Sequence, residues 1–271
     1  MHILNVLPEI SSEPLAEITK GYQLSQMLFT AIDYGIFDLL KDPKSAQQIS
    51  EEIRTDAVIT EKFLDVLVAL ALLSKTDDKY ANTKLAATFL VADSTFYQGN
   101  RVRMAARNYP NWTNLRQALK DGGIQKATQE KHDYIDRVFT LGHAEGALSG
   151  GLQRAVNAVA ALPEFKKAKK LLDLGGGHGL YAVAFAQLNP EIDIAVFDLP
   201  HVLEITRDYL EQYGMLERVR VIPGDFTVDE LGNGYDIVFA SDVTVTDILP
   251  KIHSALEDDG ILIHRRWALH E

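Results

Sequence analysis

The sequence predicts an α/β protein in which a doubly wound parallel sheet follows a helical amino-terminal part. From Lys170 onward, short apolar segments alternate with segments of helical periodicity, which is typical of a parallel sheet with helices on both faces. Before that residue, apolar side chains recur mainly at the three- and four-residue spacing of amphipathic helices. These two patterns divide the chain into a helical part and a sheet-forming part.

The first helices of the chain are predicted from apolar spacing and capping residues. One helix carries apolar positions from Leu24 and ends near Gly35. Ser45 and Gln48 have the spacing of a capping box, which predicts that a second helix begins there. Thr60 is predicted to precede a third helix. Two short segments around the polar pair at 77–78 then predict a hairpin, and three helices followed by a hairpin describe a winged helix.

Charge argues against nucleic acid as the partner of this winged helix. The chain carries a formal net charge of −11, and the third helix contains Glu61 and Asp65 against Lys62 alone. Binding to phosphate groups requires a basic surface, so we expect these helices to dimerise and the chain not to bind nucleic acid.

The sequence has no cysteine, which excludes thiolate chemistry. It shows neither a signal-peptide pattern nor an apolar run long enough to cross a membrane, and we expect a cytoplasmic protein.

Residues 84–165 are predicted to be mainly helical. Trp112, Leu115 and Leu119 have helical spacing, and two glycines at 122–123 then interrupt the pattern. The predicted domains are a winged-helix dimerisation domain at 1–100, a helical linker and substrate-pocket region at 101–165, and a Rossmann-like domain at 166–271.

The sheet-forming part contains five predicted strands and three predicted helices. The strands are expected at 170–174, 192–197, 218–222, 235–240 and 260–264, and the helices near 179–188, 201–213 and 247–257. In such a sheet, ligands bind at the carboxyl ends of the strands.

A glycine-rich turn follows the first of these strands and opens a helix. Its pattern is Asp-x-Gly-x-Gly-x-Gly, from Asp173 to Gly179. A dinucleotide fingerprint would place glycine at position 180, where the chain has leucine. The tighter spacing suits a ligand without a pyrophosphate, such as S-adenosylmethionine, although a plain strand-to-helix turn is the alternative.

Carboxylates also end the next two strands. Asp198, which lies 25 residues after Asp173, is placed to accept hydrogen bonds from a ribose diol, or alternatively to cap the following helix. Asp225 can accept from an adenine amino group, and Phe226 can pack on the ring. The alternative for that pair is a turn aspartate followed by a core phenylalanine.

The three strand ends together resemble the S-adenosylmethionine-dependent O-methyltransferase family that includes the caffeate and acetylserotonin enzymes. The matching segments are residues 173–179, 197–200 and 224–226, and upstream segments at 35–40, 69–73 and 80–83 resemble the family's dimerisation winged helix. The resemblance implies S-adenosylmethionine as cofactor, a small-molecule acceptor and a homodimer. No metal is expected, because His253 and His264 lack the carboxylate arrangement of a metal site. The resemblance also implies cofactor contacts at Asp173, Gly175, Gly177, Asp198, Leu199, Asp225, Phe226 and Ser241.

The chain departs from the family's pattern at the catalytic base. The histidine that takes the acceptor's proton in the family aligns with Val245, which cannot accept a proton. His143, in the segment where the family's interdomain helix approaches the methyl donor, is the candidate base outside that position, and a surface or helix-capping role is its alternative. His178 is expected to shape the glycine turn.

A second departure concerns the carboxyl terminus. The sequence ends at Glu271, soon after the fifth predicted strand, where the family continues with further strands, and residues 261–263 are expected to form an apolar sheet edge. The sequence therefore predicts an S-adenosylmethionine-dependent methyltransferase, with O-methyl transfer to a small molecule. The alternative is a catalytically silent homologue that serves as a regulatory or scaffold subunit.

Overall fold

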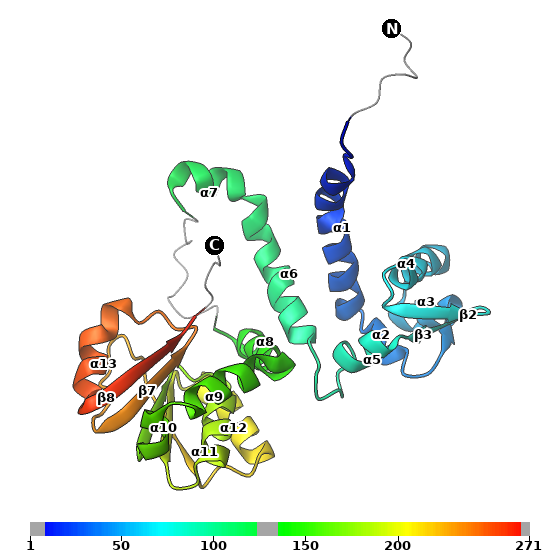
Figure 1. Cartoon of the computed structure of the whole chain (residues 1–271). Helices are drawn as coiled ribbons and strands as arrows, with labels where there is room; N and C mark the ends of the chain where they lie inside the picture. The colour runs from blue at the N-terminus through cyan, green and yellow to red at the C-terminus, as the bar shows by residue number, and fades with distance from the viewer. Residues whose placement is uncertain (1–8, 124–134, 267–271) are drawn as a thin grey trace. The chain divides into compact units, whose positions relative to one another are not determined.

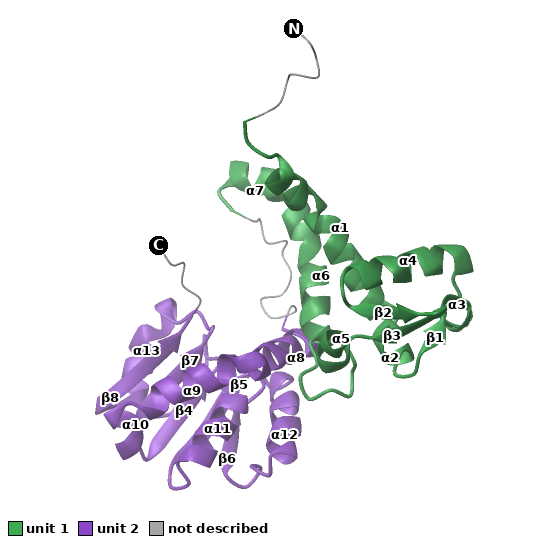
Figure 2. Cartoon of the chain, turned by 45° about the vertical axis from the view of Figure 1, so that its right-hand side comes forward, with its two compact units in different colours: residues 1–124 green, residues 125–271 purple. Residues whose placement is uncertain are grey.

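The computed structural model describes residues 9–123 and 135–266 of the chain. The chain divides into two compact units, residues 1–124 and residues 125–271, which Figure 2 draws in different colours. Each unit has its own hydrophobic core, and the α/β class predicted from the sequence is confirmed. Among the described residues, no helix combines the length and the apolar character that crossing a membrane requires.

Unit 1 is built from helices and a three-stranded antiparallel sheet of order β1-β3-β2. Its elements are α1 (Glu13–Asp33), α2 (Ile36–Leu39), β1 (Lys44–Ser45), α3 (Ala46–Ile53), α4 (Ala57–Ala69), β2 (Leu73–Thr76), β3 (Lys79–Asn82), α5 (Lys84–Phe89), α6 (Gly99–Thr113) and α7 (Leu115–Asp121). Phe37, Leu64 and Tyr80 are among its most deeply buried side chains. The predicted order of helices and hairpin is confirmed.

The predicted capping box begins α3 in the structure. The backbone N–H of Gln48 donates to Ser45 Oγ at 3.3 Å, and the N–H of Ser45 donates to Gln48 Oε1 at 2.9 Å. Both bonds satisfy N–H groups that have no partner within the helix.

We expect Ser45→Ala to lower the stability of α3 by about 1 kcal/mol, measured by amide hydrogen exchange in that helix. Ser74→Ala, which removes a long 3.4 Å bond to the Ala81 carbonyl, is the control and is expected to change it far less.

Two predicted helix starts in unit 1 are wrong. The first helix begins at Glu13 rather than near Leu24. The prediction missed its first turns because they are exposed on all sides and show no buried stripe. Helix α4 begins at Ala57, since Asp56 Oδ1 accepts the N–H of Ile59 at 2.9 Å. Thr60 lies inside this helix, so a nearby aspartate performs the capping role assigned to it.

The helical spacing at 112–119 crosses a boundary between two helices. Helix α6 ends at Thr113 and α7 begins at Leu115, with Asn114 between them. The side chains of Trp112 and Leu119 are 70% and 77% exposed, so their spacing does not mark a buried face within unit 1. The predicted glycine break is present, because Gly122 ends α7 with a φ of 75°.

Unit 2 contains a five-stranded parallel sheet of order β6-β5-β4-β7-β8. Its elements are α8 (Arg137–Gly146), the π-helix η2 (Ala147–Gly151), α9 (Leu152–Ala160), α10 (Pro163–Lys167), β4 (Lys170–Leu174), α11 (Leu180–Leu188), β5 (Asp193–Asp198), α12 (Val202–Gln212), β6 (Val219–Pro223), β7 (Tyr235–Ser241), the 3₁₀ helix η3 (Thr246–Ile248), α13 (Leu249–Ala255) and β8 (Leu256–Arg265).

Helices cover both faces of this sheet, as Figure 1 shows. Successive strand residues point to opposite faces, so Leu171 packs in the core beneath α9 to α12, whereas Leu172 packs in the core beneath α13. Ile194 and Ala195 divide between the two cores in the same way. Full burial on both faces explains why the strands are continuous apolar runs in the sequence. The doubly wound fold is therefore confirmed.

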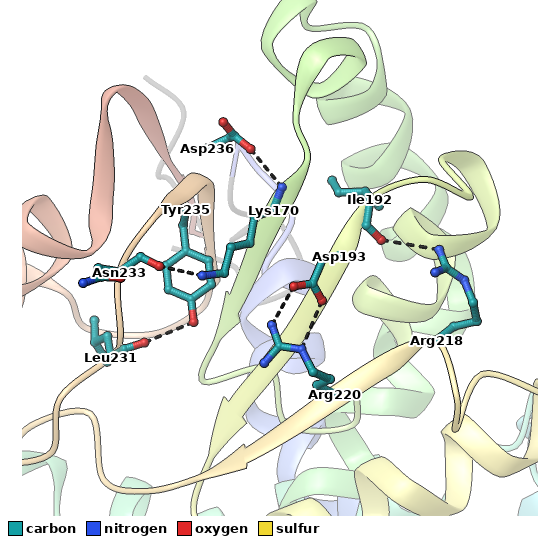
Figure 3. A network of polar contacts seen from close by, with 9 residues as sticks. All are labelled: Lys170, Ile192, Asp193, Arg218, Arg220, Leu231, Asn233, Tyr235 and Asp236. Atoms are coloured by element: carbon teal, nitrogen blue, oxygen red, sulfur yellow. Dashed lines mark hydrogen bonds and ion pairs between the residues drawn. The ribbon is translucent and has the colours of Figure 1, made fainter.

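Charged side chains link the amino ends of the strands, at the opposite end of the sheet from the glycine turn (Figure 3). Arg220 pairs with Asp193 through two hydrogen bonds of 2.8 and 3.1 Å. Asp236 accepts the N–H of Lys170 at 2.8 Å, and the Lys170 ammonium lies 4.5 Å from the centre of the Tyr235 ring. These contacts hold neighbouring strands in register and leave the carboxyl ends for a ligand.

The fifth strand is longer than predicted. It begins at Leu256, and α13 ends at Ala255, because the acidic residues 257–259 form an irregular stretch of β8 rather than the end of a helix. The backbone passes so close here that a Cβ on Gly260 would lie 2.8 Å from the Tyr235 carbonyl oxygen. Within the described residues, β8 is an edge of the sheet, as expected for residues 261–263.

Candidate functional site

The candidate site lies at the carboxyl ends of β4, β5, β6 and β7. Strand β4 pairs with β5 on one side and with β7 on the other, although β5 and β6 come between them in the sequence. The chain therefore reverses its direction of travel across the sheet at β4, and such a switch point is where open α/β sheets bind ligands.

The glycine turn between β4 and α11 adopts a backbone that only glycine accommodates easily. Gly175, Gly177 and Gly179 have φ values of 65°, 55° and 71°. The N–H of Gly175 donates to the Phe197 carbonyl at 2.8 Å, which ties the turn to the end of β5. The turn thus presents backbone rather than side chains to a ligand at the start of a helix.

His178 is the side chain that shapes this turn, as predicted. It is 6% exposed, and its Nδ1 accepts the N–H of Leu180 at 3.1 Å, which satisfies a donor at the start of α11. Burial, with smaller effects of His143 and Arg265, lowers the pKa of His178 to about 3. The imidazole is therefore neutral at neutral pH.

Asp198 connects the end of β5 to the glycine turn. Its Oδ2 accepts the N–H of Gly177 at 2.8 Å, and its Oδ1 accepts the N–H of Leu199 at 2.7 Å. The side chain is 7% exposed. Helix α12 begins at Val202 with no side-chain cap, so the structure does not support the helix-capping alternative. The carboxylate is instead fixed at the junction of two strand ends, where an ionised group can accept further hydrogen bonds.

Asp225 and Phe226 follow β6 at the same edge of the sheet. Asp225 Oδ1 accepts from the N–H and the hydroxyl of Thr227 at 2.8 and 2.7 Å, which is the contact of a turn aspartate. The Phe226 ring is half-buried, and a Cβ on Gly175 would lie 3.5 Å from its Cε1. The aromatic ring therefore lies beside the glycine turn, although it also packs on the core beneath α13.

Asp173 lies directly beneath the turn and is 1% exposed. Its Oδ2 has no hydrogen-bond partner among the described residues. Burial, with a smaller effect of Asp198, raises the pKa of Asp173 to about 7. A Cβ on Gly176 would lie 2.8 Å from Oδ2, so the carboxyl group packs closely against the backbone of the turn.

Arg265 is a polar residue of the site that the sequence analysis missed. It ends β8, and its Nη1 donates to Ser241 Oγ at 2.9 Å and to Asp242 Oδ2 at 2.7 Å. The guanidinium lies 5.9 Å from the centre of the Tyr181 ring. These contacts hold the segment after β7, where Asp242 has a φ of 58°. In the sequence, the only indication of this role is that Arg265 directly follows the strand predicted at 260–264.

The two residues considered for the catalytic base differ in their surroundings. Val245 is 4% exposed and packs in the core beneath α13, so it is a structural residue there. His143 lies on α8, half-buried, with its ring centre 4.3 Å from that of Phe139. Its Nδ1 is 2.9 Å from the Phe139 carbonyl oxygen, which only accepts. Nδ1 therefore carries the proton of the neutral ring, and Nε2 is the acceptor nitrogen.

Known families match both units of the chain. The O-methyltransferase dimerisation domain matches residues 16–92, and the O-methyltransferase domain matches residues 112–265. The chain is 33% identical to the uncharacterized protein MJ0086 of Methanocaldococcus jannaschii over 96% of this chain and 71% of that protein. It is 29% identical to the N,N-dimethyltransferase OxyT of Streptomyces rimosus over 94% of this chain and 78% of that protein.

A solved structure has the same fold. The structure of human N-acetylserotonin methyltransferase in complex with SAM superimposes with a TM-score of 0.80 at 24% identity, and the match covers 96% of this chain and 81% of that one. At this identity the likeness supports the fold, and the family matches cover the site.

Proposed function

The chain belongs to the O-methyltransferase family and is an S-adenosylmethionine-dependent methyltransferase, and we propose that the ends of β4, β5 and β6 hold its cofactor. The observation that carries this proposal is the position of Asp198, whose carboxylate is fixed against the N–H of Gly177 at the switch point of the sheet. When bound, the cofactor supplies an electrophilic methyl group on a sulfonium. The protein's own contribution is then largely to position donor and acceptor.

Each strand end has a proposed role. Asp198 accepts hydrogen bonds from the two ribose hydroxyls, and half-buried Leu199 packs beside them. Asp225 accepts from the adenine amino group, and Phe226 packs on the ring. The turn at Gly175 and Gly177 and the underlying Asp173 hold the aminocarboxypropyl end, and Ser241 lies at the end of β7 on the same edge. A fixed, buried carboxylate and a glycine turn with positive φ values support these assignments.

The proposed proton acceptor is His143, because Val245 stands at the family's base position. The hydrogen bond to the Phe139 carbonyl orients the imidazole and leaves Nε2 as its acceptor nitrogen. Positioned general bases contribute roughly 10²- to 10⁴-fold to rate, so an acceptor that is already ionised would depend on His143 less.

Transfer of a labelled methyl group tests the activity. The chain is incubated with methyl-labelled S-adenosylmethionine and a panel of phenols, amines and thiols, and we expect label in at least one small molecule. The methyltransferase names of OxyT and of the acetylserotonin enzyme favour this outcome over a silent subunit. Label in none of the acceptors, although the donor binds, would favour the silent subunit instead.

A homodimer through unit 1 is the proposed assembly. Helix α1 exposes Leu15, Ile18 and Tyr22 by 67%, 77% and 55%, at the spacing of one helix face. These residues lie in the matched dimerisation domain or just before it. Burying such an apolar face against a second copy would remove it from water.

The three-part division at 1–100, 101–165 and 166–271 and the cytoplasmic location stay predictions of the sequence.

Charge on the exposed face of α1 is expected to break this dimer. Ile18→Glu places a carboxylate in the proposed interface, so we expect sedimentation equilibrium to show a dissociation constant at least tenfold higher than for the unaltered chain. Thr19→Glu adds the same charge at the neighbouring position of the helix and serves as the control. An equal loss of dimer in both variants, or in neither, would contradict an interface centred on Ile18.

A further inference from the structure

Asp173 is the one described buried side chain of the proposed cofactor site that has an orphaned oxygen. Its Oδ2 is enclosed and has no hydrogen-bond partner among residues 9–123 and 135–266. The carboxyl group packs beneath Gly176, and its neighbour along the edge of the sheet is a second carboxylate, Asp198. Two acidic groups therefore lie close together: two backbone N–H groups hold Asp198, whereas Asp173 has a hydrogen bond with one, that of Ala182.

These surroundings favour different protonation states for the two carboxyl groups. Asp198 accepts two N–H groups, which stabilise its ionised form. Asp173 is removed from water and lies beside that negative charge, and both conditions favour its neutral form. The free protein then keeps one proton on the inner carboxyl group of the pair.

We propose that Asp173 holds a proton in the cofactor-free protein and releases it when S-adenosylmethionine binds, so that Asp173 helps the site to prefer the sulfonium donor over the uncharged thioether product. The inference rests on the proposed cofactor site. A cation bound against the turn stabilises the ionised carboxylate beneath it, because opposite charges attract strongly where water is excluded. S-adenosylhomocysteine lacks the sulfonium charge and provides less of this stabilisation.

The other charged groups near Asp173 do not provide the same proton in this pH range. His178, in the turn, is neutral because burial lowers its pKa to about 3. Tyr181, on α11, faces Asp173 and has a pKa raised mainly by burial. Arg265 is paired with Asp242, which follows β7. His143, on α8, interacts with His178 in the turn, and a variant must separate its contribution.

Proton release is measured by titration calorimetry of the full chain in two buffers of different ionisation enthalpy. At about pH 6.5 the amino groups of both ligands carry their protons. We expect S-adenosylmethionine to release more protons than S-adenosylhomocysteine does. From about pH 6 to 7, the affinity for the donor relative to the product is expected to rise by up to tenfold. This comparison of the two ligands uses the unaltered chain, so its result does not depend on whether a variant folds.

Three variants assign the proton. Asp173→Asn is uncharged at every pH and is expected to bind both ligands with a ratio that no longer changes from about pH 6 to 7. Asp242→Asn removes a nearby carboxylate at a left-handed position that asparagine tolerates, and His143→Gln removes the imidazole; both are expected to keep the proton release. Equal release with the two ligands, or unchanged release in Asp173→Asn, would overturn the inference. Failure of both ligands to bind would overturn the proposed site as well.

Discussion

Asp198→Ala is expected to weaken S-adenosylmethionine binding roughly 10²- to 10⁴-fold, because hydrogen bonds from two hydroxyls to a carboxylate are worth about 1.5–3 kcal/mol each. The substitution also removes the acceptor that holds the N–H of Gly177. Titration calorimetry measures the effect, and amide hydrogen exchange in β5 checks that the strand still forms.

Asp193→Ala is the matched control for this experiment. Asp193 begins the same strand that Asp198 ends, and it pairs with Arg220 at the surface, where both side chains are about half exposed. Exposed ion pairs contribute at most about 1 kcal/mol, so the control should bind the cofactor normally. A loss of affinity below tenfold in Asp198→Ala would remove the ribose role from this residue.

Gly175→Ala is expected to abolish cofactor binding and to destabilise unit 2 by about 2–5 kcal/mol. The backbone there has a φ of 65°, which costs an alanine about 1–2 kcal/mol. The new Cβ would also lie 2.6 Å from Val243 Cγ2, and overpacking of this kind adds about 1–3 kcal/mol. Amide hydrogen exchange in β4 and β5 reports the stability of this unit alone.

Gly214→Ala separates the two contributions. Gly214 has a φ of 68° in the same unit, and a Cβ there would meet no atom within 4 Å. We therefore expect the backbone cost alone, about 1–2 kcal/mol, with cofactor binding retained. If the two alanine variants were equally stable and bound the cofactor equally well, the close packing of the turn against Val243 would have no part in the site.

The strands that build the site were predictable because they are buried on both faces. Both ends of the strand at 170–174 were predicted correctly, since an apolar run followed by glycines leaves little choice. Strand β8 was harder, because the acidic residues 257–259 interrupt its apolar pattern and the preceding helix can equally include them. Only pairing with β7 decides between these structures.

The roles of individual polar residues depended on the fold. The sequence left Asp198 open between capping a helix and holding a ligand, and the position of the Gly177 N–H distinguishes the two. Arg265 was missed because a single arginine at a strand end has no motif, although it reaches Ser241 from the neighbouring strand. The orphaned oxygen of Asp173 depends on packing beneath the turn, which no spacing in the sequence predicts.

The most direct test of the central claim is titration calorimetry of the intact chain with S-adenosylhomocysteine. The product carries the ribose, the adenine and the aminocarboxypropyl group, so it requires every strand end assigned here without needing an acceptor. We expect one site per chain, with a dissociation constant on the order of 10 μM, and loss of that site in Asp198→Ala. Absence of binding at about 1 mM ligand would contradict a cofactor site at the ends of β4, β5 and β6.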